Sequence, residues 1–155
     1  MDETALGWSA EEQQAWRGFV RMNERLVGRL SRRLLAESRL SPADFAVLAH
    51  LSEAPDGRQR AQDLARSVEW EKSRMSHHIA RMVGRGLVAR EGCTEDGRGA
   101  FVALTEAGRA AIEAAAPLHV TAVRELFLDQ VTPAELRMLA RLSERVVEAL
   151  DEEPA

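Results

Sequence analysis

Residues 61–86 read AQDLARSVEWEKSRMSHHIARMVGRG and contain two short helix patterns separated by about one turn. In the second pattern three apolar side chains point within about 40° of one another at 100° per residue and form a core stripe: Met75, Ile79 and Met82. The opposite face carries side chains that can hydrogen-bond to base edges and phosphates: Ser73, Arg74, His77 and Arg81. The segment predicts a helix-turn-helix, although a surface helix with a solvated polar face shows the same pattern. The flanking segments decide between the two.

The sequence period changes after Gly86. Residues 87–91 and 100–104 have the pattern of two strands, and the eight residues between them include three glycines. This predicts a hairpin with a long, charged tip that carries Arg98, with Arg90 near its base. A hairpin directly after a helix-turn-helix is the order of a winged helix, while an ordinary solvated hairpin is the alternative.

Capping signals place the remaining helices. Ser9 opens a long helix that continues to about residue 37, and Ser41 with Pro42 at the first helical position opens the next. Thr105 caps a second long helix that we expect to bend at Pro117 and to end near residue 130. Ser9 with Glu12 and Thr132 with Glu135 each have the spacing of a capping box, and the second one precedes the last helix.

The long terminal helices carry apolar stripes that one small winged helix cannot cover. We therefore assign residues 9–40 and 105–150 to a helical dimerisation region and residues 41–104 to a winged helix-turn-helix DNA-binding domain. Residues 1–8 and 151–155 are expected to be flexible ends. The predicted fold class is mainly α (α+β).

Composition favours an ordered, soluble chain of 155 residues, with 45% hydrophobic and 30% charged residues. No apolar run is long enough to span a bilayer, and the acidic first eight residues lack the apolar core of a signal peptide. We therefore expect a cytoplasmic protein without membrane contact or cofactor. A single cysteine, Cys93, excludes an intramolecular disulfide.

The distribution of charge matters more than the net charge of −4. Residues 58–98 hold nine Lys or Arg against six Asp or Glu, a local charge of +3, while the rest of the chain holds twelve against nineteen, a charge of −7. This segregation suits a DNA-facing middle on an acidic scaffold, although a solvated surface can show it too.

From residue 9 to residue 150, the order of elements and several local strings resemble the MarR family of winged-helix transcriptional regulators. The most specific strings are Arg85-Gly86-Leu87-Val88, then Arg90, the Asp96-x-Arg98 pair and Leu104-Thr105-x-x-Gly108. The resemblance implies that Arg98 reaches a minor groove and that Asp96 helps to fix the wing. It also implies a dimer that binds near-palindromic double-stranded DNA, often a repressor, often released by a small aromatic or phenolic effector.

By the same resemblance, one set of residues matches the DNA-contacting helix of the family: Ser73, Arg74, Ser76, His77, His78 and Arg81. The turn at residues 67–70 departs from the family pattern, because a glycine is expected there more often.

Other functions fit less well. The chain shows no Ser-His-Asp string, phosphate-binding glycine loop or CxxC metal motif that would indicate an enzyme. A metal-responsive regulator is disfavoured because adjacent His77 and His78 point about 100° apart on a helix, and His50, among apolar neighbours, is expected to be a hydrogen-bonded core residue. Redox sensing by Cys93 and a winged helix used only for protein contacts remain alternatives.

Overall fold

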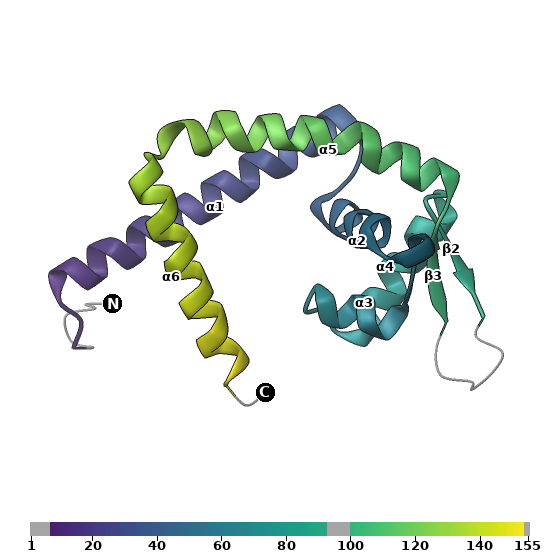
Figure 1. Cartoon of the computed structure of the whole chain (residues 1–155), viewed down its shortest axis with the longest axis horizontal. Helices are drawn as coiled ribbons and strands as arrows, with labels where there is room; N and C mark the ends of the chain where they lie inside the picture. Colours follow the sequence, from purple (N-terminus) through teal and green to yellow (C-terminus); the bar gives the residue numbers. More distant parts are fainter. Residues whose placement is uncertain (1–6, 93–99, 154–155) are drawn as a thin grey trace. The chain divides into compact units, whose positions relative to one another are not determined.

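A computed structural model describes residues 7–92 and 100–153. It is mainly helical with one small sheet (Figure 1), which confirms the predicted fold class. In chain order the elements are α1 (Ala10–Ser38), α2 (Pro42–Glu53), the 3₁₀ turn η2 (Pro55–Gly57), β1 (Arg58–Arg60), α3 (Ala61–Ser67), α4 (Lys72–Gly84), β2 (Val88–Glu91), β3 (Phe101–Leu104), α5 (Glu106–Leu126), the 3₁₀ turn η3 (Leu128–Gln130) and α6 (Pro133–Asp151).

The chain divides into two compact units, residues 1–120 and 121–155. This division differs from the domain boundaries that the sequence predicts after residues 40 and 104. The reason is that Leu34 of α1 and Ile112 of α5 are buried in the same core as the helix-turn-helix. The assignment of both chain ends to dimerisation stays a prediction.

Capping boxes are present at three helix starts: the two predicted at Ser9 and Thr132, and a third at Ser41, which was predicted only as an N-cap. The Ser9 hydroxyl accepts from the backbone N–H of Glu12 at 3.1 Å, and the Glu12 carboxylate accepts from the backbone N–H of Ser9 at 2.7 Å. Ser41 with Asp44 and Thr132 with Glu135 repeat this arrangement at α2 and α6. Such local hydrogen bonds satisfy backbone donors that a helix start leaves unpaired.

The sheet has the order β1-β3-β2, and both strand pairs are antiparallel. β2 and β3 form the predicted hairpin, each beginning one residue later than expected. β1 was not predicted from the sequence, because a strand of three residues is too short to show alternation. Its Arg58 pairs with Ala103 and so ties the segment before α3 to the wing.

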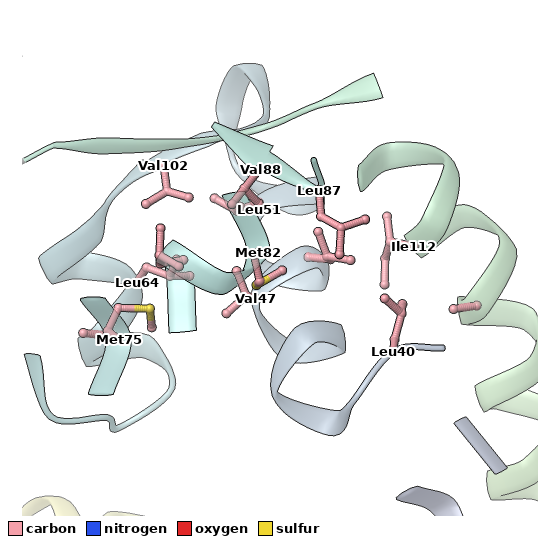
Figure 2. Close-up of a cluster of buried hydrophobic side chains, with 14 of the residues drawn as sticks. Leu40, Val47, Leu51, Leu64, Met75, Met82, Leu87, Val88, Val102 and Ile112 are labelled. Carbon is pink, nitrogen blue, oxygen red and sulfur yellow. The ribbon is translucent and has the colours of Figure 1, made fainter. Parts of the chain in front are cut away.

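The core of the first unit lies where α2, α3 and α4 meet the sheet (Figure 2). The predicted stripe of Met75, Ile79 and Met82 is at most 2% exposed, so α4 buries this whole face. Leu64 of α3 and Val102 of β3 close the core around it. The buried stripe fixes which face of α4 remains outside.

The second unit contains the end of α5, η3 and α6. The 21-residue helix α5 continues through Pro117 and ends at Leu126, earlier than expected. No side chain of α6 is buried, and large apolar residues on it remain exposed, among them Leu142, Val146 and Leu150. In the part of the chain that the structure describes, no helix is long and apolar enough to cross a membrane.

Candidate nucleic-acid interface

The face of α4 opposite the core carries five of the six helix residues assigned to DNA contact. These residues are all exposed: Ser73, Arg74, Ser76, His77 and Arg81. Met75, Ile79 and Met82 are packed in the core, so α4 cannot rotate about its own axis. The polar side chains are therefore held on the outer face. The face holds two guanidinium groups, two hydroxyls and an imidazole, which suit the acceptor-rich edge of a major groove.

His78 was predicted to contact DNA, but the structure buries it. His78 is only 6% exposed, so its side chain points into the protein and not toward the surface that would face DNA. Its Nδ1 accepts from Nη2 of Arg81 at 3.1 Å. Its Nε2 therefore carries the proton and lies 3.0 Å from Oδ1 of Asp44. Burial, together with nearby Arg81 and Arg74, lowers the pKa of His78 against the opposing effect of Asp44.

Asp44 of α2 is the centre of this buried polar cluster. Its Oδ2 accepts from Nη1 of Arg85 at 2.7 Å and from the backbone N–H of Ser41 at 2.9 Å. Burial alone would raise the pKa of Asp44, but these hydrogen bonds and the charge of Arg85 outweigh it and keep the pKa below its ordinary value. A single ionised carboxylate thus contacts α4 at its middle, through His78, and just past its end, through Arg85.

Arg85 extends this link to α1. Its Nη2 donates to the carbonyl oxygen of Arg39 at 2.8 Å. Arg39 itself adopts a left-handed conformation, with φ of 59°, at the carboxyl end of α1. One guanidinium therefore joins the end of α4 to the junction between α1 and α2. We call Asp44, His78 and Arg85 the anchor cluster.

The turn between α3 and α4 explains the departure from the family pattern. Glu69 has φ of 54°, the left-handed region that glycine adopts without a steric cost. A glycine is thus expected there for a structural reason, and this chain places a glutamate instead. The next residue, Trp70, packs partly against the core and stacks under Arg74, whose Cζ lies 4.2 Å from the ring centroid.

The hairpin is braced against α4. Arg90, predicted to lie near the base of the hairpin, is on β2 and donates from Nη2 to the carbonyl oxygen of Ser76 at 2.9 Å. The base of the hairpin is therefore hydrogen-bonded directly to the backbone of α4. Asp96, Arg98 and Cys93 lie outside the described residues, so their roles stay predictions.

The contacts of Thr105 and Gly108 explain why the Leu104-Thr105-x-x-Gly108 string has these residues. Thr105 Oγ1 donates to the carbonyl oxygen of Gly86 at 2.6 Å and accepts from the backbone N–H of Gly108 at 3.0 Å, so it caps α5 as predicted. A Cβ at position 108 would overlap the carbonyl oxygen of Leu87. Glycine therefore lets the start of α5 lie directly on the start of the wing.

His50, predicted to be a hydrogen-bonded core residue, contacts a backbone carbonyl as expected but lies outside the buried core cluster. This residue is half-buried, and its Nδ1 lies 2.8 Å from the carbonyl oxygen of Ala46. Within residues 7–92 and 100–153, no group of three or more His, Cys, Asp or Glu side chains could hold a metal ion.

A family model described as MarR family matches residues 40–99 of this chain. The crystal structure of AbsC, a MarR family transcriptional regulator from Streptomyces coelicolor, is 37% identical with a TM-score of 0.89, over 94% of this chain and 98% of AbsC. The chain belongs to the MarR family.

Two further similar proteins bear on function. Sco3205 from Streptomyces coelicolor, solved in complex with DNA, is 34% identical with a TM-score of 0.89, over 96% of this chain and 95% of Sco3205. The transcriptional repressor YetL of Bacillus subtilis is 31% identical over 110 residues, 69% of this chain and 66% of YetL. This chain is accordingly a MarR-type transcriptional regulator, and its family and relatives are regulators rather than enzymes.

Three residues that hold α4 and its side chains in place were not predicted from the sequence. In the sequence, Asp44 is notable only as an acidic residue near the positive end of a helix, Arg85 is part of a family string, and Trp70 lies in the turn that departs from the family pattern. Asp44 and Arg85 are 41 residues apart, which no local pattern connects. Trp70 stands four positions before Arg74, and this spacing was the one available signal.

Proposed function

We propose that the chain is a homodimeric repressor that binds a near-palindromic operator in double-stranded DNA. The observation that carries the proposal is the exposed polar face of α4, fixed from behind by a fully buried apolar face. Two such helices related by a two-fold axis would read half-sites about one helical turn apart. The repressor name of YetL and the DNA complex of Sco3205 support this function.

The proposal divides the contacts by chemistry. Arg74 and His77 stand in the amino-terminal half of α4, where helix-turn-helix proteins usually contact base edges. Ser73, Ser76 and Arg81 contribute contacts to phosphates or neighbouring bases. Arg98 enters a minor groove, and Asp96 holds the wing, as the family resemblance implies.

Base reading by Arg74 and His77 is tested by alanine substitution. An operator is first selected from a random DNA library with the wild-type protein, and affinity is then measured on this operator and on random DNA. Each of Arg74→Ala and His77→Ala should reduce discrimination between the two by about 1–3 kcal/mol, because a good contact to a base edge is lost. Arg137→Ala, an exposed arginine on α6, controls for the loss of one positive charge. Equal weakening on operator and random DNA would contradict base reading.

The wing is tested by salt dependence. Arg98→Ala should weaken operator and random DNA by similar factors and flatten the dependence of log K on log salt by about one unit or less per site. Identical affinities and slopes for the variant and the wild type would place the wing outside the DNA interface. If the wild-type protein shows no salt-dependent affinity for DNA, a winged helix used only for protein contacts is favoured instead.

Release by a small aromatic or phenolic effector belongs to the same proposal. A cavity of about 420 Å³ opens beside α4, within the size range of small-molecule sites, with Met75 and Ile79 on its apolar wall and Lys72 and Arg90 among its lining residues. An aromatic ring fits the apolar wall, and an acidic group fits the two cations. Displacement from the operator by phenols or aromatic carboxylates tests this part, and no displacement across such a panel would remove it. Displacement by oxidant that is lost in Cys93→Ser would favour redox regulation instead.

A further inference from the structure

Trp70 occupies a fixed position between the two helices of the helix-turn-helix. Its backbone N–H donates to the carbonyl oxygen of Ala65 at 2.9 Å, which ties it to the buried part of α3. Its side chain packs partly against the core. The indole ring therefore has a defined place before α4 begins.

The indole contacts two α4 side chains with opposite surroundings. The guanidinium of exposed Arg74 lies over the ring, 4.2 Å from its centroid. The imidazole of buried His78 meets the ring at 5.4 Å and at an interplanar angle of 88°, an edge contact. Because His78 is held in the anchor cluster, the indole is supported from the inside while it supports Arg74 on the outside.

This stacking leaves the hydrogen-bonding capacity of Arg74 intact. An aromatic face contacts the flat face of a guanidinium, while the N–H groups point outward in its plane. Two parallel hydrogen bonds to one base need that plane at a defined angle. A stacked guanidinium also loses less rotational freedom on binding than a freely moving side chain.

We propose that Trp70 is a positioning residue for operator specificity, since it holds the Arg74 guanidinium in the plane in which it reads a base edge. This inference rests on the proposed base-reading role of Arg74. Trp70 itself touches no base in this mechanism; it acts through Arg74.

The test compares Trp70→Leu, Trp70→Met and Trp70→Phe on the selected operator and on random DNA. Loss of the aromatic face in the Leu and Met variants should reduce discrimination about 2- to 5-fold, the factor that corresponds to an exposed cation–π contact. Trp70→Phe retains a flat aromatic face and should restore most of the discrimination. Two non-aromatic variants of different shape are compared at this half-buried site, and thermal unfolding identifies the folded ones.

A double-mutant cycle separates positioning from a general structural effect. In an Arg74→Ala background, Trp70→Met should cause no further loss of discrimination. The inference is overturned if Trp70→Met and Trp70→Leu discriminate as wild type does, or if they reduce discrimination equally with and without Arg74. If Arg74→Ala itself leaves discrimination unchanged, the base-reading proposal fails first, so the two failures are distinguishable.

Discussion

Gly108 shows how a single missing methyl group lets two elements touch. A Cβ at this position would overlap the carbonyl oxygen of Leu87, and that oxygen accepts from the backbone N–H of Thr105 at 3.3 Å. Gly108→Ala should therefore lower the free energy of unfolding by at least about 2 kcal/mol, although alanine is the better helix former. Urea unfolding measures the change.

The matched control is Gly18→Ala in the middle of α1, where an added Cβ meets no atom within 4 Å. There the helix preference of alanine acts alone and should raise stability by about 0.5–1 kcal/mol. Similar effects of the two substitutions would contradict the packing role of Gly108.

His78 predicts a pH dependence of stability. Burial lowers its pKa below the ordinary value of 6.5, so the unfolded chain takes up the proton at a higher pH than the folded chain. The contribution of neutral His78 to the free energy of unfolding is therefore fully present above about pH 6.5 and is lost as the pH falls toward the folded-state pKa. His78→Gln removes this titration and should make the free energy of unfolding less sensitive to pH between 7.5 and 5.5.

The measurement is urea unfolding at both pH values for the wild type and the variant. His77→Gln changes the exposed neighbouring histidine and serves as the control. The groups that face His78 are Asp44 of α2, Trp70 of the turn, and Arg74 and Arg81 of α4. An equally steep loss of stability in His78→Gln and wild type would show that protonation of His78 does not oppose folding.

Among the elements, α4 is held to α2 by the ion pair of Asp44 and Arg85. A double-mutant cycle with Asp44→Asn and Arg85→Ala should give a coupling energy of about 1–2 kcal/mol, because the carboxylate is buried although the Arg85 side chain is 44% exposed. Urea unfolding of the two single variants and the double variant supplies the energy.

The exposed pair of Asp63 and Arg66 provides the comparison within α3. Its atoms are 3.3 Å apart and its side chains are 42% and 77% exposed, so solvent screens the pair. The corresponding cycle should give less than about 0.5 kcal/mol. A coupling energy for Asp44 and Arg85 no larger than this would mean that the pair does not anchor α4.

Local signals account for the elements that the sequence predicted. Capping boxes, glycine turns and the 3.6-residue stripe of α4 are set by neighbours in the chain, and the structure contains them. β1 was missed because its three residues are too few to show alternation and because its partners on β3, such as Ala103 for Arg58, are distant in the chain. The prediction of His78 was wrong for a related reason, because its partner Asp44 belongs to another helix.

At the scale of the whole molecule, the apolar faces of α1 and α6 predict a homodimer. Phe19 on α1 and Val146 on α6 are 51% and 49% exposed, more than a large apolar side chain retains in a packed core. Light scattering should therefore give twice the chain mass at micromolar concentration. Val146→Glu should shift the equilibrium toward monomer, since a carboxylate would be buried without a partner.

Arg141→Glu, on the polar side of α6, changes charge without touching the apolar stripe and should leave the dimer intact. A monomeric wild type, or equal dissociation in both variants, would exclude these faces as the dimer contact.

The anchor cluster also bears on how related sequences can diverge. A carboxylate that serves Ser41, His78 and Arg85 together cannot be replaced alone without leaving a buried donor or a charge without its partner. Positions 44, 78 and 85 are therefore expected to covary as a set. On the outer face of α4, Arg81 contacts His78 and Arg74 contacts Trp70, whereas Ser73 and His77 are exposed residues outside the anchor cluster and can be exchanged one at a time. Evolution can thus retarget this scaffold to new operators while the anchor is inherited unchanged.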